Sequence, residues 1–195
     1  MNTRYAAVVL AGGFSTRMKQ FKPLLPLDKE NITSHVIGTF LNADVDVILV
    51  TGYRHQEVAA ALDERDINIV YNPDYALGML SSVQAGVRHL HPSHQAFLVL
   101  PVDIPLVRPA TIRHLMAFSV KNQGKLIYPV FRGKRGHPPL IPSRLASDIL
   151  EYTKNGGLKA ILSSLDGLAL DVPVADSFIL FDIDTPDDYR RQNPG

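Results

Sequence analysis

A segment near the N-terminus combines paired glycines with two cations. It reads L-A-G-G-F-S-T-R-M-K-Q-F-K-P from Leu10 to Pro23 and directly follows an apolar run. Paired glycines let the backbone approach a ligand closely and point several N–H groups at phosphate oxygens, while Arg17 and Lys22 add charge-assisted hydrogen bonds. The third glycine of a dinucleotide fingerprint and the G-K-S/T of a Walker A loop are both missing. The segment predicts a polyphosphate-binding loop, and a plain glycine turn is the alternative.

Two carboxylates follow apolar runs and could hold a cation beside that loop. Asp103 follows the apolar residues of L-V-L-P-V-D-I-P, and Asp184 lies in F-D-I-D-T-P, where Asp182 would point the same way in an extended chain. Hard carboxylate oxygens suit Mg²⁺, and such sites orient and neutralise phosphates. A helix N-cap near Pro109 or Pro186 is the structural alternative for the two carboxylates.

Two other segments carry polar groups suited to substrates. N-P-D-Y-A-L-G-M-L-S-S lies between a predicted strand and helix, and its Gly78, Ser81 and Ser82 could bind a nucleobase edge or a phosphate. A plain helix cap is the alternative. The basic loop R-G-K-R-G-H-P could hold a second substrate through Arg135 and His137, with a structural histidine as the alternative.

The apolar pattern predicts the fold that positions these residues. Val, Ile and Leu occur without alternation in runs typical of strands buried on both faces, at residues 5–10, 45–51, 67–71 and 96–102. Segments of helical length separate them, at residues 32–43, 56–65 and 80–90. The alternation indicates an α/β fold with a mostly parallel, doubly wound sheet and helices on both faces. Its ligand crevice is expected beyond the carboxyl ends of the strands.

The second half of the chain mixes short strands and helices. Strands are expected at residues 126–131, 139–141 and 168–174, and helices at residues 109–119, 143–152 and 157–165. Residues 178–183 are expected to be extended and to lead into a helix start at residues 184–188. No internal repeat or long linker divides the chain, so residues 1–195 are expected to form one domain.

Composition narrows the function classes. The 195 residues are 46% hydrophobic and include no Cys, which excludes disulfides, a thiolate nucleophile and Cys-ligated zinc. The apolar runs are far shorter than the roughly 20 residues of a membrane helix, and the first residues show no signal peptide, so a cytoplasmic protein is expected. A net charge of +1 with 8% aromatic residues argues against a nucleic-acid partner.

Charge is unevenly distributed along the chain. Residues 1–27 contain four basic residues and no acid, and residues 75–147 contain nine basic residues with Asp103 as the single acid. Residues 166–188 contain seven Asp and no Lys or Arg. This distribution suits a polyanionic substrate handled with a divalent cation, and ordinary surface scatter is the alternative.

Five motifs span residues 10–188 in one order: L-A-G-G-F-S-T-R-M-x-x-F-K-P-L-L-P, G-M-x-S-S-V-Q-A-G, P-V-D-I-P, R-G-H-P and D-I-D-T-P. They resemble the motifs of the molybdenum cofactor cytidylyltransferases, which belong to the nucleotidyltransferases with a glycosyltransferase-A-like α/β fold. The resemblance implies Mg²⁺-dependent transfer in which the terminal phosphate of molybdopterin attacks the α-phosphate of an NTP and pyrophosphate leaves. Such an in-line displacement needs positioning and charge neutralisation but no protein nucleophile.

The resemblance also implies roles for individual residues. Lys22, Arg17 and Asp103 would act in catalysis. Arg17 would bind the β- and γ-phosphates, and Lys22 would stabilise negative charge at the α-phosphate. Asp103 and Asp184 would hold Mg²⁺. The implied nucleotide-binding set is Leu10, Ala11, Gly12, Gly13, Ser15, Arg17, Lys22, Gly78, Met79, Ser81 and Ser82.

Two positions depart from the family pattern. Lys19 stands where the family usually has Gly, which costs on the order of 1 kcal/mol if the position needs a positive φ. Gly12 stands where cytidylyl-transferring members usually have Ala, so the pair resembles the guanylyl-transferring relatives and leaves CTP and GTP both open. Other open alternatives are a sugar- or polyol-phosphate acceptor and a non-catalytic nucleotide- or cofactor-binding maturation factor. A molybdoenzyme or its maturation factor is a further expected partner.

Overall fold

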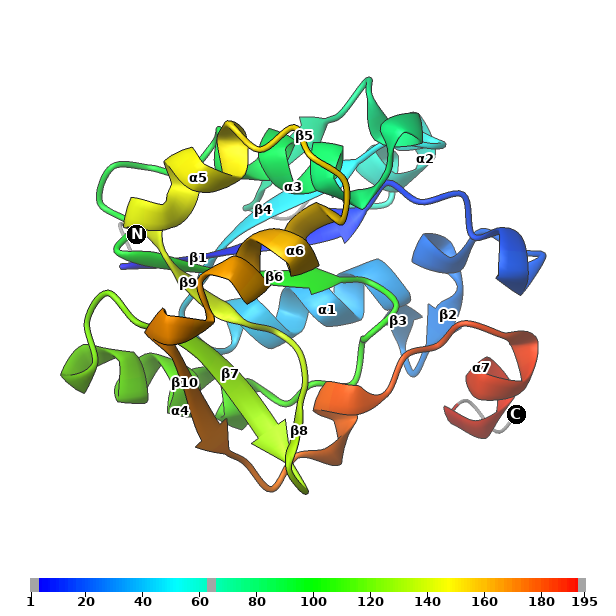
Figure 1. Ribbon diagram of the computed structural model, residues 1–195. Coiled ribbons are helices and arrows are strands. Elements are labelled where there is room, and N and C mark those ends of the chain that lie inside the picture. Colours follow the sequence, from blue (N-terminus) through cyan, green and yellow to red (C-terminus); the bar gives the residue numbers. More distant parts are fainter. Residues whose placement is uncertain (1–3, 63–65, 193–195) are drawn as a thin grey trace.

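The computed structural model describes residues 4–62 and 66–192. Their main feature is an eight-stranded sheet in the order β10-β7-β9-β6-β1-β4-β5, with β8 paired to β7 (Figure 1). Its strands are β1 (Tyr5–Ala11), β4 (Asp46–Thr51), β5 (Asn68–Tyr71), β6 (Ala96–Pro101), β7 (Leu126–Phe131), β8 (Lys134–Arg135), β9 (Leu140–Pro142) and β10 (Ala169–Pro173). The strands β2 (Pro26–Leu27) and β3 (Glu30–Asn31) form a separate antiparallel pair.

Most of the sheet is parallel, as the apolar pattern predicts. Strands β6, β1, β4 and β5 are neighbours and all run in one direction; Val8 of β1, for example, pairs with Ile48 on one side and Val99 on the other. Strand β10 is parallel to β7. Strand β9 runs against both β6 and β7, because the turn after β7 sends the chain back along the sheet. The prediction of a mostly parallel α/β sheet is confirmed.

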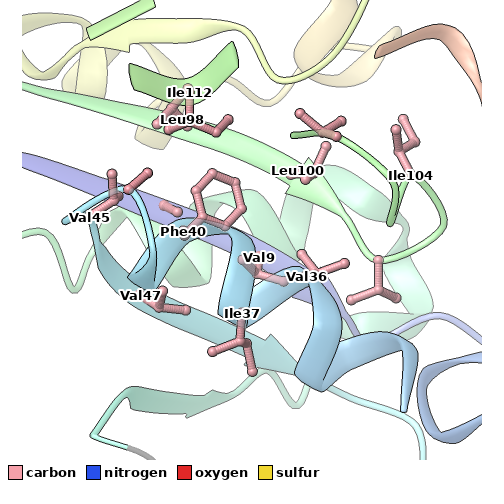
Figure 2. Close-up of a cluster of buried hydrophobic side chains, with 14 of the residues drawn as sticks. Val9, Val36, Ile37, Phe40, Val45, Val47, Leu98, Leu100, Ile104 and Ile112 are labelled. Atoms are coloured by element: carbon pink, nitrogen blue, oxygen red, sulfur yellow. The ribbon is translucent and has the colours of Figure 1, made fainter. Parts of the chain in front are cut away.

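Helices cover both faces of the sheet. On one face lie α1 (Ile32–Leu41), α2 (His55–Ala60) and α4 (Pro109–Lys121), and on the other α3 (Met79–Val87), α5 (Ala146–Leu150) and α6 (Gly157–Ser164). Successive strand residues point to opposite faces, so Val9 packs with α1 whereas Val8 packs with α3. Figure 2 shows the first core, where Phe40 of α1 lies against β1 and β6.

The chain ends in helix α7 (Pro186–Gln192), which lies beside β2 (Figure 1). The Tyr189 hydroxyl donates a hydrogen bond to the Pro26 carbonyl and ties the helix to this pair of strands. No helix in the described part of the chain is long and apolar enough to span a membrane.

Three expected elements differ from the structure. The helix expected over residues 143–152 is a 3-10 turn, Ser143–Leu145, followed by the short helix α5. Residues 178–183 do not start extended: Ser177–Leu180 form a 3-10 turn because the Asp176 carboxylate accepts the N–H of Phe178 at 3.1 Å. The helix expected over residues 56–65 begins at His55 and ends at Ala60. Residues 63–65, the last part of that predicted helix, lie outside the described residues. Residues 1–3, part of the segment in which no signal peptide is expected, also lie outside them.

Candidate active site

Parallel pairing of β1 with β6 brings the glycine loop and Asp103 together. Leu10 and Pro101 are partners in register, and the N–H of Val102 donates to the Leu10 carbonyl at 3.1 Å. The loop after β1 and the residues after β6 therefore lie side by side at the carboxyl ends of their strands. Open α/β sheets bind ligands at these strand ends.

The loop after β1 is held by local contacts. Thr16–Met18 form a 3-10 turn between Ser15 and Lys19, which both adopt left-handed backbone angles, with φ of 54° and 58°. The Ser15 hydroxyl accepts the Lys22 N–H at 3.1 Å, and Met18 is buried. Lys19 thus occupies a conformation that favours glycine and costs an L-residue on the order of 1 kcal/mol. The loop keeps the glycine-type shape despite the lysine.

A second long-range contact delivers Asp184. The N–H of Ile183 donates to the Asp103 carbonyl at 2.7 Å, which fixes the C-terminal segment against the end of β6. Lys22 Nζ then lies 3.2 Å from Asp184 Oδ1 and 4.0 Å from Asp103 Oδ2. Arg17 Nη1 lies 2.7 Å from Asp184 Oδ2. Two cations from the N-terminal loop and two carboxylates from distant segments form one cluster.

The members of this cluster differ in exposure. The Lys22 side chain is 9% exposed, whereas that of Arg17 is 72% exposed. Burial raises the pKa of Asp103; Lys22 opposes this rise, and the negative charges of Asp184 and Asp182 add to it. A further cation beside Asp103 would offset the cost of its burial and stabilise its ionised form.

The cluster lines one side of a cavity of about 360 Å³. Most of the predicted nucleotide and metal residues line it: Leu10, Ala11, Gly12, Gly13, Ser15, Arg17, Lys22, Gly78, Met79, Ser82, Asp103 and Asp184. Four residues singled out from the sequence do not: Ser81, Arg135, His137 and Asp182. The volume suits part of a nucleotide-sized ligand, with the remainder reaching open solvent.

Ser81 has the structural role of the helix-cap alternative rather than a place in the cavity lining. Its hydroxyl lies 2.8 Å from the carbonyls of Asp74 and Gly78, within the turn that opens α3. Gly78 has a φ of 108°, which an L-residue rarely adopts, so the turn depends on this glycine.

Arg135, which is predicted to bind the acceptor, forms ion pairs outside the cavity lining. Its Nε donates to Asp171 at 2.6 Å, its Nη1 pairs with Asp166, and its guanidinium lies over the Tyr128 ring at 4.5 Å. Asp171 lies on the edge strand β10, which pairs with one side of β7 while β8 pairs with the other, so Arg135 reaches across β7 to this carboxylate. The acidic segment thus neutralises the basic loop through ion pairs, and this contact turns Arg135 away from the cavity.

His137 is also outside the cavity lining. Its backbone N–H donates to the Ile179 carbonyl at 2.8 Å, and its side chain keeps accessible surface. Partial desolvation of the ring lowers the pKa of the imidazole. The histidine anchors the loop to the 3-10 turn before Asp184.

Residues other than Asp103 and Asp184 cap the starts of helices α4 and α7. The Asp176 carboxylate accepts the Arg108 N–H at 3.0 Å and the Thr111 hydroxyl at 2.7 Å, at the start of α4. At α7, the Thr185 hydroxyl accepts the Asp188 N–H at 3.2 Å. Among the described residues, the carboxylates of Asp103 and Asp184 form no hydrogen bond to the start of a helix, so the capping alternative is wrong for both.

Aromatic residues at the cavity were missed from the sequence. The ring of Phe14 lies 5.4 Å from that of Tyr75 and 5.3 Å from that of Tyr53, and Phe14 and Tyr75 line the cavity. A Cβ on Gly52 would stand 2.5 Å from the Tyr75 Cβ, so Gly52 makes this packing possible. The signal available in the sequence was the position of each aromatic next to a motif glycine or turn.

Comparisons with known proteins identify the family of the chain. The MobA-like NTP transferase domain matches residues 7–169. The molybdenum cofactor cytidylyltransferase of Escherichia coli (strain K12) is 32% identical over 183 residues, which cover 93% of this chain and 92% of that protein. Rv0371c from Mycobacterium tuberculosis H37Rv superposes with a TM-score of 0.85 at 23% identity over all of both chains. Its manganese complex gives a TM-score of 0.77 at 22% identity, over 99% of this chain and 100% of that one. The chain belongs to the family of MobA-like NTP transferase domains, and it is a nucleotidyltransferase.

Proposed function

We propose that this protein is a Mg²⁺-dependent CTP:molybdopterin cytidylyltransferase that releases pyrophosphate. The observation that carries the proposal is the cluster in which Lys22 lies between Asp103 and Asp184 beneath the glycine loop. The identity of 32% to the Escherichia coli cytidylyltransferase over nearly the whole chain supports the choice of donor and acceptor.

The carboxylates of Asp103 and Asp184 fit a magnesium site. Both approach the same ammonium group, so both face one small region that already holds a positive charge. Within the described residues no third His, Asp or Glu joins them, and Mg²⁺ commonly uses one or two carboxylates together with waters and substrate phosphates. When bound, the ion supplies charge neutralisation for the triphosphate and the leaving pyrophosphate. A manganese complex of Rv0371C supports a divalent cation in this fold.

The two cations divide the work on the triphosphate. Arg17 is exposed and pairs with Asp184 through Nη1, so it can exchange this carboxylate for the β- and γ-phosphates. Lys22 is buried and held by two carboxylates, which suits a fixed charge beside the α-phosphate. A preorganised cation in a site that excludes water stabilises developing charge strongly. Backbone N–H groups at residues 10–13 would hold the nucleotide.

The transfer is an in-line displacement at phosphorus. An oxygen of the acceptor's terminal phosphate forms a bond to the α-phosphorus while the bond to the pyrophosphate oxygen breaks. The acceptor phosphate is already ionised at neutral pH, so the protein provides orientation and charge rather than a base or a nucleophile.

GTP is the second candidate donor, and Gly12 favours it. The glycine pair resembles that of the guanylyl-transferring relatives, and a Cβ at Gly12 would stand 3.3 Å from Gly52 N and 3.5 Å from the Ser82 hydroxyl, so the alanine of cytidylyl-transferring relatives would crowd these two residues. A sugar- or polyol-phosphate acceptor, a molybdoenzyme partner and a cytoplasmic location stay predictions.

The test is a transfer assay with matched substrates. The protein is incubated with Mg²⁺, molybdopterin and each NTP in turn, and pyrophosphate is measured. We expect release with CTP above all other nucleotides, and loss of release with EDTA. Higher turnover with a sugar or polyol phosphate would replace molybdopterin as acceptor, and no release with any pair would contradict nucleotidyl transfer to it.

A further inference from the structure

Asn72 is a buried polar side chain that the transfer itself does not use. It follows β5 and is 3% exposed. Its Nδ2 donates to the hydroxyls of Ser81 and Ser82, each at 3.0 Å, and its Oδ1 accepts the N–H of Asp74 at 3.0 Å. One amide therefore links the loop after β5 to the start of α3.

The orientation of this amide follows from hydrogen-bond chemistry. The Asp74 N–H can only donate, so the atom that faces it must be the carbonyl oxygen of Asn72. The NH₂ group then faces both serines, and each serine oxygen accepts one of its protons. A flipped amide would set two donors against each other at Asp74.

The two serines differ in where their own protons go. The Ser81 hydroxyl has carbonyl acceptors at 2.8 Å, on Asp74 and Gly78. Within residues 4–62 and 66–192, the Ser82 hydroxyl makes only the bond that it accepts from Asn72. Ser82 is 6% exposed, lines the cavity and lies beside Gly12. Its proton is left to point at a ligand in the cavity.

We propose that Asn72 is a positioning residue that holds the Ser82 hydroxyl as a hydrogen-bond donor toward the nucleoside part of the nucleotide. The inference rests on the proposed function, because it requires an NTP in this cavity. The ligand atom facing Ser82 must then be an acceptor, such as a base carbonyl oxygen or an unprotonated ring nitrogen. A nucleoside that presents an N–H there meets a second donor and leaves buried polar groups unpaired, which discriminates strongly between ligands.

Asn72→Asp inverts this polarity with little change in size. The carboxylate still accepts the Asp74 N–H but also accepts from the Ser82 hydroxyl, which then offers only lone pairs to the cavity. We expect the Kd of the tighter-binding nucleotide, CTP or GTP with Mg²⁺, to rise about tenfold in titration calorimetry, the scale of one hydrogen bond. The contact is remote from the reacting phosphorus, so kcat should change by less than about twofold while KM rises.

Three comparisons separate positioning from a merely structural role. Ser82→Ala should raise Kd about tenfold by itself. Asn72→Asp added to Ser82→Ala should raise Kd by less than about twofold more, because the two residues act through one contact. Ser81→Ala removes the neighbouring bond of the same amide outside the cavity lining, and its Kd should stay within about threefold of wild type. Circular dichroism and melting temperature check folding, and Ser82→Ala against Ser81→Ala tests the inference if Asn72→Asp does not fold.

The outcomes distinguish this inference from the proposed function. An unchanged Kd in Asn72→Asp or in Ser82→Ala, or a full additional loss in the double variant, would overturn the role of Asn72. Absence of pyrophosphate release with these Kd differences intact would contradict the transfer alone. Absence of binding by both CTP and GTP to the wild-type protein would overturn both.

Discussion

Two loops of this protein look alike in sequence and do different things in the fold. The loop after β1 combines glycines with Arg17 and Lys22, and the loop after β7 combines glycines with Arg132, Lys134 and Arg135. Both contain residues with left-handed backbone angles, Lys19 in the first and Arg132 in the second. The first loop leaves the interior of a parallel sheet, and its cations meet carboxylates of the cavity. The second is a turn at the sheet edge, where β10 supplies Asp171 to Arg135.

The comparison shows that topology assigns the role of a cation. The carboxyl end of a central parallel strand opens on a crevice lined by neighbouring strand ends, so charges there face a ligand. A hairpin near the edge of the sheet faces solvent and its neighbour strand. Its charged residues therefore form exposed ion pairs, which contribute little to the free energy of folding. Both loops contain glycines and basic residues, so their composition alone does not distinguish their roles.

The largest expected contrast concerns the carboxylates that face each loop. Asp103→Ala should lower kcat at least ~100-fold, a loss comparable to removing one electrostatic stabiliser of the transition state. Asp171→Ala, the matched change at the edge loop, should leave kcat within about twofold. Pyrophosphate release under saturating NTP measures both. Near-normal turnover in Asp103→Ala would remove this carboxylate from the reaction.

The next largest effect is expected from removing the charge of Lys22. Lys22→Met keeps the length of the side chain and removes its charge, and we expect kcat to fall about tenfold or more while the nucleotide Kd rises less, because the contact strengthens in the transition state. Single-turnover kinetics and titration calorimetry give the two quantities. A pure loss of affinity at constant kcat would assign Lys22 to ground-state binding instead.

Backbone strain offers a smaller, paired test. Lys19→Gly and Arg132→Gly each relieve a left-handed conformation, with φ of 58° and 50° in the parent residues. Each should raise the free energy of unfolding by about 0.5–1 kcal/mol in urea titrations, since strain relief exceeds the entropy cost of glycine. A loss of stability in Lys19→Gly would mean that the lysine side chain itself supports the loop.

The smallest effect is expected at Arg135. Its side chain is 38% exposed, and its ion pairs with Asp166 and Asp171 are partly solvated. Arg135→Gln should change the free energy of unfolding by less than about 1 kcal/mol and kcat by less than about twofold. A tenfold rise in the KM for molybdopterin would instead place Arg135 at the acceptor site.

Local patterns in the sequence predict the sheet well. Residues 126–131 match β7 at both ends, and the other central strands differ by one or two residues, because strands buried on both faces need continuous apolar runs. The 3-10 turn of Ser177–Leu180 was not foreseen, because it depends on the side chain of Asp176.

The site was predictable where topology alone decides it. Parallel strand ends bring Asp103 to the glycine loop, and the motif order indicated Asp184. The pairing of Arg135 with carboxylates 31 and 36 residues further on, and the amide of Asn72 behind Ser82, required the coordinates. Sequence spacing does not show which side chain a distant strand will place opposite a cation.

Binding of Mn²⁺ in the presence of CTP tests most directly whether Asp103 and Asp184 face one cation beneath the glycine loop. Electron paramagnetic resonance reports free Mn²⁺, so a titration gives its Kd in the wild type, Asp103→Asn, Asp184→Asn and the edge control Asp171→Asn. We expect each cavity variant to weaken Mn²⁺ binding at least about tenfold, and the edge control to match the wild type. Equal Mn²⁺ affinity in all four proteins would contradict a metal site between these carboxylates.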